Sequence, residues 1–155
     1  MTAYLFLTRW SVRAPLEKVW DAIYHSERWP QWWRGVEEAQ EIRAASGPYG
    51  VGSVRRFTWK SRLPYRLTFE LAVTRVDPLS RIESTAAGEL EGTGIWSFAQ
   101  DGPFVRVRYR WDVRTTKPWM NAVAPLARPF FRWNHDIIMA WGFQGLQKWL
   151  QAVQS

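Results

Sequence analysis

Cysteine is absent from this chain of 155 residues, and histidine occurs only twice, as His25 and His135. The lack of cysteine excludes disulfide bonds, thiolate zinc sites and a cysteine nucleophile, and it is compatible with the reducing cytoplasm, where we expect the protein to act. Neither histidine has the spacing to another histidine or to a pair of carboxylates that metal ligation requires. We therefore expect no metal site.

Several other signals are missing as well. Apolar runs fall short of the roughly 18 residues needed to cross a bilayer, and residues 1–10 lack the basic start of a secretory signal, so we expect neither a membrane span nor a cleaved leader. No Gly-x-Ser-x-Gly motif marks a serine nucleophile. Gly92-Thr93-Gly94 lies between expected strands and does not open a helix, as a phosphate-binding loop would. We expect no nucleotide chemistry and no cofactor.

Tryptophan, in contrast, is abundant, with twelve copies in a chain that is 46% apolar and 23% charged. Each indole brings a large rigid apolar surface and one N–H that needs a partner when it is buried. So many indoles indicate either a wide apolar interior or an exposed aromatic contact surface. No Ser/Gly-rich linker and no repeat divides the chain, so we expect one domain over residues 1–155.

Positive charge is concentrated in the last third of the chain. Residues 1–101 carry 13 basic and 12 acidic side chains, whereas residues 102–155 carry 8 basic side chains against Asp112 and Asp136. Four of these cations alternate with apolar residues, as on the solvated face of an antiparallel strand: Arg106, Arg108, Arg110 and Arg114. A solvated strand face is the preferred interpretation and contact with an anionic membrane surface is the second, while we expect no nucleic-acid partner.

The hydropathy pattern predicts a strand, two short helices, about six further strands and a long helix. Alternation in Tyr4–Arg13 predicts the first strand, Pro15 suits the start of the first helix, and Glu27–Trp33 forms the second short helical segment. The later strands are predicted at residues 36–44, 53–60, 66–76, 81–87, 91–100 and 105–113. Short turns between them indicate an antiparallel meander, and only a curved sheet can wrap around so long a helix.

The long helix is predicted over Trp119–Val153, with Thr116 as its cap and Pro118 in its first turn. Pro125 and Pro129 predict a kink, or a separate short helix around residues 119–127. One side of the long helix combines bulky residues with two glycines and an asparagine: Phe131, Asn134, Ile137, Ile138, Trp141, Gly142, Gly145, Trp149 and Val153. We expect the small residues to leave gaps against the sheet, and gaps beside a polar group suggest a ligand cavity.

Four segments in this order carry a resemblance that covers nearly the whole chain: Ala14–Ile23, Trp29–Trp33, Gly50–Gly52 and Gly92–Phe98. They resemble the START-related SRPBCC superfamily, also called polyketide cyclase/dehydrase-like. The resemblance implies an α+β helix-grip (START-like) fold, with a curved seven-stranded antiparallel sheet wrapped around the long C-terminal helix and two short helices after the first strand. It also implies a hydrophobic tunnel between sheet and helix, but no single activity, because this fold hosts binders, transfer proteins and enzymes.

Polar groups on apolar faces are the candidates for chemistry. A buried Asn134 without partners would cost about 1–3 kcal/mol, so its amide should bond a backbone carbonyl, a tryptophan N–H or a ligand. His135 lies nearer the edge of the helix face, where it is either a surface group or an acid or base at the cavity wall. Arg55 alternates with inward-facing aromatics and should pair with a carboxylate or a ligand oxygen. Glu70 should face outward in a solvated cross-strand ion pair.

The tryptophans divide into two groups. Periodicity places the first group on inward faces, as core or cavity lining: Trp20, Trp96, Trp111 and Trp141. The second group lies near expected loops or helix ends, where indoles form a lid, a dimer patch or a membrane-interface anchor beside Arg128 and Arg132: Trp29, Trp32, Trp33, Trp119 and Trp133.

These observations favour a protein that binds a hydrophobic small molecule, such as a polyketide, aromatic or lipid-like compound, between the sheet and the C-terminal helix. The residues expected to line the site are Arg55, Phe57, Trp59, Phe69, Trp96, Phe98, Tyr109, Trp111, Phe130, Asn134, Ile138 and Trp141. The alternatives are a cofactor-independent cyclase/dehydrase that uses His135, Asn134 or Arg55, and a lipid carrier at a membrane surface. The ligand and the oligomeric state are left open.

Overall fold

A computed structural model describes the backbone of residues 3–154 and the side chains of residues 3–152. Seven antiparallel strands form one curved sheet in the order β1-β7-β6-β5-β4-β3-β2. The strands are β1 (Ala3–Val12), β2 (Val36–Arg43), β3 (Val54–Trp59), β4 (Leu67–Asp77), β5 (Arg81–Gly88), β6 (Leu90–Asp101) and β7 (Phe104–Thr115). The helices are α1 (Leu16–Tyr24), α2 (Trp29–Trp32) and α3 (Pro118–Gln154), with short 3₁₀ turns η1 (Ser26–Arg28) and η2 (Pro48–Gly50).

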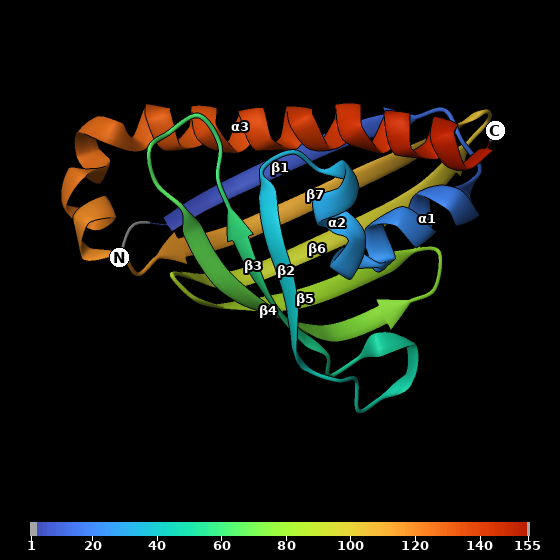
Figure 1. Cartoon of the computed structure of the whole chain (residues 1–155), viewed down its shortest axis with the longest axis horizontal. Helices are drawn as coiled ribbons and strands as arrows, with labels where there is room; N and C mark the ends of the chain where they lie inside the picture. Colours follow the sequence, from blue (N-terminus) through green and yellow to red (C-terminus); the bar gives the residue numbers. More distant parts are fainter. Residues whose placement is uncertain (1–2, 155) are drawn as a thin grey trace.

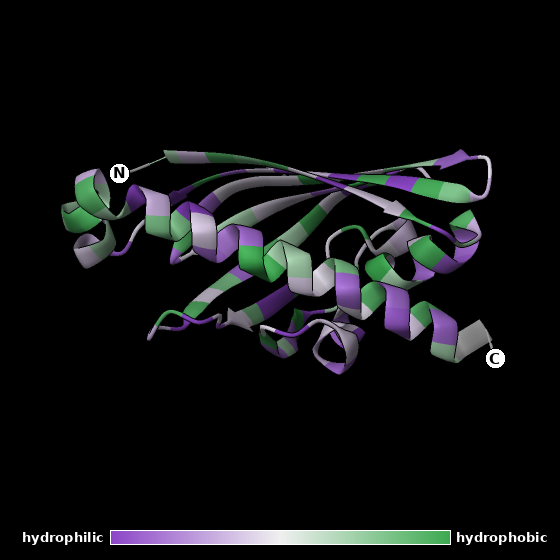
Figure 2. Ribbon diagram, turned by 90° about the horizontal axis from the view of Figure 1, so that it is seen from above, coloured by the Kyte–Doolittle hydropathy of each residue, from purple (hydrophilic) through white to green (hydrophobic). Residues whose placement is uncertain are grey.

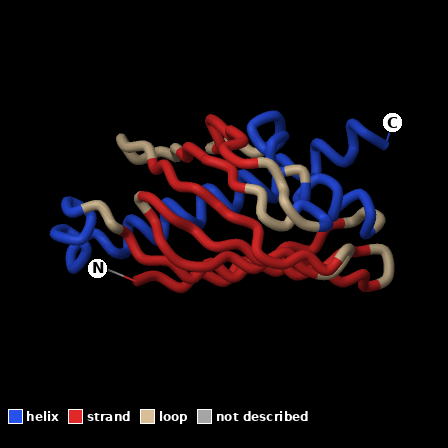
Figure 3. Tube along the Cα trace, turned by 90° about the horizontal axis from the view of Figure 1, so that it is seen from below, coloured by secondary structure: helices blue, strands red, loops and turns tan. Residues whose placement is uncertain are grey.

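All helices lie on the concave side of the sheet (Figure 1). Helix α3 runs along the sheet, and α1 and α2 sit beneath its C-terminal half, as the view from below also shows (Figure 3). The expected helix-grip architecture, with two short helices after the first strand, is therefore confirmed.

The sheet has one apolar and one polar face because its strands alternate. In β7, buried and exposed residues follow one another from end to end, and Val105, Tyr109 and Trp111 point toward the helices. The four alternating arginines of this strand are exposed on the outer face. Their interpretation as a solvated strand face agrees with the structure.

Helix α3 is bent near its start. Pro125 and Pro129 lie inside it, and each removes one backbone donor and crowds the preceding turn. The first turns consequently curl away from the axis of the remaining helix at the left of Figure 1. We call residues 118–131 the arm. The prediction that Thr116 caps this helix is wrong: its hydroxyl donates to the carbonyl of Gly88, and the hydroxyl that accepts the N–H of Lys117 belongs to Thr115.

The two glycines of α3 do not leave gaps. A Cβ on Gly142 would lie 2.5 Å from Cε2 of Trp33, and one on Gly145 would collide with the carbonyl oxygen of Trp32. Trp33 also donates its indole N–H to the carbonyl of Ile138 at 2.8 Å. The glycines thus allow α2 to pack closely on α3, so the expectation that they open a cavity is wrong. Val153, the last residue of the predicted face, has a side chain outside the described part.

Candidate functional site

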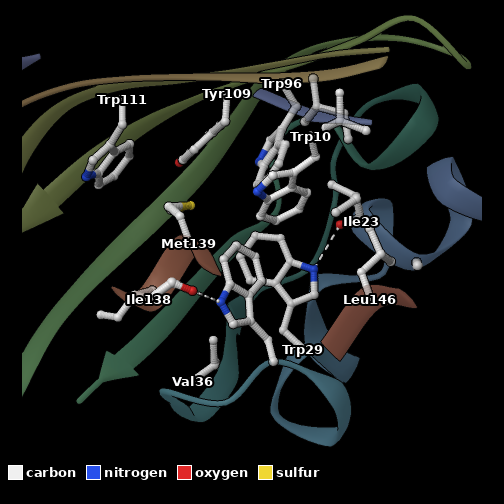
Figure 4. Close-up of a cluster of buried hydrophobic side chains, with 14 of the residues drawn as sticks. Trp10, Ile23, Trp29, Val36, Trp96, Tyr109, Trp111, Ile138, Met139 and Leu146 are labelled. Atoms are coloured by element: carbon white, nitrogen blue, oxygen red, sulfur yellow. Dashed lines mark hydrogen bonds between the residues drawn. The ribbon is translucent and has the colours of Figure 1, made fainter. Parts of the chain in front are cut away.

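The space between the helices and the sheet is divided by three aromatic rings that pack on one another. Trp29 of α2 approaches Trp96 of β6 with 6.1 Å between ring centroids, and Trp96 stacks on Tyr109 of β7 at 4.0 Å. These three side chains line the chambers on both sides of them. Figure 4 shows Trp29 reaching from its helix toward Trp96 and Tyr109 on the sheet. We call Trp29, Trp96 and Tyr109 the aromatic partition.

The first chamber, which we call the apolar chamber, has a volume of about 90 Å³ and lies between the N-terminal half of α3 and the sheet. Its wall is mostly aromatic, and rings from β1, β3, β4 and β7 contribute to it. Of the residues expected from the sequence to line a ligand site, seven line this chamber: Trp59, Phe69, Trp96, Tyr109, Trp111, Asn134 and Ile138.

Polar atoms without partners lie in the wall of the apolar chamber. Among the described residues, Oδ1 of Asn134 and both ring nitrogens of His135 are buried without a hydrogen-bond partner. The hydroxyl of Tyr4 and the indole N–H of Trp59 share this condition. The expected bond from Asn134 to a carbonyl or a tryptophan is therefore not made. Groups of this kind usually find a partner in native proteins, so they are the ligand-contact candidates of this wall.

His135 is kept neutral by its surroundings. Its ring stacks on Phe6 with 3.9 Å between centroids. Burial, together with the positive charge of Arg132, lowers the pKa of His135 from 6.5 to about 3. A neutral imidazole offers one donor and one acceptor, which suits contact with a hydroxyl or carbonyl group. Of the two positions that the sequence left open for His135, the structure shows the one at the cavity wall.

The second chamber, which we call the polar chamber, has a volume of about 210 Å³ and lies between β3–β6, the end of α1 and the turns η1 and η2. Its wall includes these polar side chains besides three tyrosines: His25, Ser26, Glu41, Ser53, Arg55 and Ser84. Phe57 and the partition residues supply apolar surface. This chamber can therefore accept a polar part of a ligand that the apolar chamber excludes.

Arg55 points into the polar chamber, in agreement with its strand position. Its Nη1 donates to Oγ of Ser26 at 2.9 Å, and its Nη2 lies 3.3 Å from Oε2 of Glu27. Its Nε is buried and has no partner among the described residues. The same Glu27 lies 3.2 Å from Nδ1 of His25. Arg55 thus pairs with a carboxylate, as expected, and keeps one donor for another acceptor.

The partition residue Tyr109 holds its hydroxyl over the backbone of β6. A Cβ on Gly94 would lie only 2.7 Å from that oxygen, so glycine is required for this close approach. Burial raises the pKa of Tyr109 above its ordinary value. The phenol therefore remains protonated and can donate a hydrogen bond.

Three expected lining residues lie elsewhere. Phe98 is buried but packs on Trp20 at 5.1 Å and reaches neither chamber. Phe130 is exposed on the arm, because the bend of α3 turns it outward. Trp141 is half-buried, with the guanidinium of Arg34 stacked 4.2 Å from its ring.

The positions expected for the tryptophans near loops are also corrected by the structure. Trp29, Trp32 and Trp33 are buried and form no lid or exposed patch, because α2 and the residue after it pack against the core. Figure 4 shows Trp29 pointing into this core. Trp119 and Trp133 are partly exposed. Glu70 faces outward and pairs with Arg56 at 2.9 Å, as expected.

Some lining residues were missed from the sequence. Tyr4 and Phe6 of β1, Tyr65 and Met139 line the apolar chamber. Tyr4 and Phe6 alternate with Leu5 and Leu7 in the expected first strand, and this spacing is a signal that places them on one face of the sheet. His135 is four residues after Phe131 and three before Ile138, a spacing that places all three on one side of a helix.

The sequence matches the family described as polyketide cyclase / dehydrase and lipid transport over residues 12–138. The chain belongs to this family. The resemblance to SRPBCC proteins is thereby confirmed, and the family fold is one that binds small molecules. No curated protein matches the sequence.

Solved structures agree with the fold. The protein TTHA0849 from Thermus thermophilus has a TM-score of 0.81 at 18% identity, covering 98% of this chain and 100% of that one. The Zhui aromatase/cyclase from Streptomyces sp. R1128 has a TM-score of 0.77 at 12% identity, covering 97% and 94%. A START superfamily protein from Mycobacterium smegmatis has a TM-score of 0.76 at 13% identity, covering 96% and 98%.

Two further observations concern residues 3–154 alone. No three His, Asp or Glu side chains in this range are grouped so that they could hold a metal ion. No helix within the same range has both the length and the apolar character needed to cross a bilayer.

Proposed function

We propose that the protein binds a hydrophobic, hydroxyl- or carbonyl-bearing small molecule of polyketide, aromatic or lipid-like type between α3 and the sheet. The observation that carries the proposal is the aromatic wall of the apolar chamber with its unpartnered Asn134 and His135. Apolar burial drives binding at about 25 cal/mol per Å² of ligand surface, and the polar atoms set its orientation.

The aromatic partition moves when the ligand enters. The apolar chamber, at about 90 Å³, is smaller than the roughly 150 Å³ that is known to hold benzene. A ring-sized guest therefore turns Trp96 or Tyr109 aside and joins the two chambers. The joined space places the polar end of the ligand near Arg55, whose Nε lacks a partner.

The test combines native mass spectrometry of the purified protein with thermal unfolding in the presence of naphthols and of fatty acids of graded length. A compound present at 100 times its Kd should add about 2.7 kcal/mol of stability, which for this size raises Tm by roughly 5–10 °C. The Asn134→Leu variant should bind hydroxyl-bearing compounds roughly tenfold more weakly. Gln144→Leu, which changes an exposed residue of the same helix, is the matched control.

Two results contradict this proposal. One is a protein that carries no small molecule and gains no stability from any compound of the panel. The other is equal weakening of binding in Asn134→Leu and Gln144→Leu, because it would remove the polar wall from the interaction.

The second candidate function is a cofactor-independent cyclase/dehydrase, and the buried neutral His135 is the observation that favours it. In ring closure, an enol carbon of the substrate forms a bond to a carbonyl carbon, and the carbonyl oxygen takes up a proton. The neutral ring of His135 would take the enol O–H proton on one nitrogen and give its own N–H proton to the carbonyl oxygen from the other. When water leaves, the ring would likewise take a C–H proton next to the new hydroxyl group and protonate that hydroxyl group. Orientation in the joined chambers supplies most of the rate.

A short synthetic poly-β-ketone tests this candidate, because closure and loss of water produce an aromatic product that absorbs ultraviolet light. His135→Gln should lower turnover at least tenfold and retain binding, while Gln144→Leu, on the exposed side of the same helix, should leave turnover unchanged. Turnover that is equal in the wild type and His135→Gln would exclude this role for His135.

A further inference from the structure

The outer face of the sheet carries a row of polar side chains that crosses four strands. Arg9 of β1 lies directly opposite Arg108 of β7. Ser97 of β6 lies between Arg108 and Arg81 of β5. Because opposite residues of antiparallel strands point to the same face, these four side chains lie side by side. We call them the arginine row. Figure 2 shows the helices on one side of the strands, so no helix covers the row.

Two cations of the row have no anion between them. Arg9 and Arg108 are both exposed, and neither forms an ion pair with a carboxylate within residues 3–152. Like charges that lie directly opposite in an antiparallel pair are destabilising, since their Cβ atoms are only about 4.5–5.5 Å apart. A bound anion would therefore relieve a repulsion that the free protein retains.

The other arginines of the outer face around this pair have carboxylate partners. Their ion pairs are Arg81–Glu83 at 2.9 Å, Arg106–Asp101 at 2.8 Å, Arg110–Asp112 at 4.0 Å and Arg114–Glu91 at 4.0 Å. The unpaired positive charge is thus confined to Arg9 and Arg108. A bilayer, a nucleic acid or an acidic protein surface would also meet the surrounding carboxylates, whereas one small dianion would not. Charge complementarity selects the small dianion.

The arginine row lies in a shallow hollow of about 400 Å³. All four of its side chains line this hollow, and no acidic side chain of the described residues does. Leu7 and Ile95 line it as well, and they lie opposite Arg110 on its two neighbouring strands. The hollow therefore offers guanidinium groups and a hydroxyl to an anion, and apolar surface to a group attached to that anion.

We propose that the arginine row binds the phosphate group of a soluble phosphate monoester. Such a group carries about 1.5 to 2 negative charges at pH 7 and has three acceptor oxygens. It can neutralise both Arg9 and Arg108, which a single carboxylate cannot. Guanidinium groups bind phosphate through pairs of parallel hydrogen bonds, and the hydroxyl of Ser97 supplies a further donor. The organic part of the ester rests on Leu7 and Ile95.

The test is isothermal titration calorimetry with phenyl phosphate and with benzoate, at pH 7.5 and constant ionic strength. Benzoate has the same ring but a single charge, so phenyl phosphate should bind at least tenfold more tightly. Arg9→Gln and Arg108→Gln should each weaken phenyl phosphate binding roughly tenfold, because each removes charge-assisted hydrogen bonds. Arg114→Gln is the matched control on the same face of β7, and it should bind phenyl phosphate as the wild type does.

Thermal unfolding without phosphate separates binding from a structural role. Arg9→Gln and Arg108→Gln should have a Tm equal to that of the wild type or up to about 3 °C higher, because each removes the repulsion across the strands. A residue that merely stabilised the sheet would lower Tm when replaced. Weaker binding together with an undiminished Tm therefore assigns the two arginines to a ligand.

Three outcomes overturn the proposal. The first is phenyl phosphate that does not bind, or binds no more tightly than benzoate. The second is an equal loss of binding in Arg114→Gln and Arg9→Gln. The third is co-flotation with phosphatidic acid vesicles that Arg9→Gln/Arg108→Gln abolishes, which assigns the row to a lipid headgroup. The proposal does not depend on the proposed function, because both chambers lie on the other face of the sheet.

Discussion

His135 makes the stability of the protein depend on pH. The pKa of His135 is about 3 in the folded state and 6.5 ordinarily. Between pH 3 and pH 6.5 this histidine is therefore protonated in the unfolded chain and neutral in the folded protein. The free energy of unfolding therefore falls as pH falls below 6.5, by up to about 1.4 kcal/mol per unit, and levels off near pH 3. We expect urea unfolding at pH 5 to give a value about 2 kcal/mol lower than at pH 7.5.

A histidine variant isolates this effect above the range where most carboxylates titrate. His135→Gln should flatten the pH dependence between pH 5 and 7.5, while Gln144→Leu, which changes an exposed residue of the same helix, should retain it. An unchanged slope in His135→Gln would show that another group is responsible.

At the level of single residues, alternation was a sound guide for the strands and a weaker one for α3. Arg55 was expected to point inward to a carboxylate and does so, because the period of two in a strand leaves only two directions. Asn134 and His135 both line the apolar chamber, but for His135 the sequence could not decide between the surface and the cavity wall. The buried face of α3 is rotated from the predicted one, because Met139, Leu146 and Leu150 are buried. Successive residues of a helix point about 100° apart, so a shift of one residue turns an edge position into an interior position.

The contact between α2 and α3 depends on glycine. In an open helix, Gly→Ala stabilises by about 1 kcal/mol, but here a Cβ on Gly142 would lie 2.5 Å from the Trp33 ring. We expect Gly142→Ala to lower the free energy of unfolding by about 1–3 kcal/mol in urea titration. Gly47→Ala is the control, since its Cβ would meet Val51 at an ordinary 3.5 Å. Equal stability of both variants would contradict the close packing.

The helices and strands were easier to predict from the sequence than the contacts between them. The strands and both short helices occur close to their predicted bounds, because hydropathy period and turn residues are local signals. Trp33 fills the space beside Gly142, and these two positions are more than 100 residues apart in the sequence. A pattern along one helix cannot tell whether a small residue opens a gap or admits a neighbouring indole.

The whole sheet should show graded protection from hydrogen exchange. Strand β7 is paired on both sides, with β1 and β6, and its inward side chains are buried. Strand β2 lies at an edge, most of its side chains are exposed, and its pairing with β3 has two register shifts. We expect amides of β6 and β7 to exchange slowest and those of β2 fastest among the strands, measured by mass spectrometry of peptic peptides. Equal rates in β2 and β7 would contradict this order.

The interior as a whole differs from the single tunnel expected from the resemblance. The fold and its curved sheet follow from the element order, but the volume of the interior cavities depends on the side-chain directions of twelve tryptophans. Trp29, expected near a loop surface, instead joins Trp96 and Tyr109 and separates two chambers. The direction of a side chain in a short helix is decided by tertiary packing, and the local hydropathy pattern does not predict it.

The pairing of β1 with β7 has a consequence for synthesis of the chain. Ala3 lies opposite Arg114, and Val12 lies opposite Val105. During translation, the first strand leaves the ribosome long before its partner exists, and its apolar side stays without a neighbour meanwhile. Closure of the sheet is therefore a late event that waits for residues 104–115, and distant pairing of this kind slows folding. A nascent chain that stops short of β7 would expose Tyr4, Phe6 and Trp10 to chaperones.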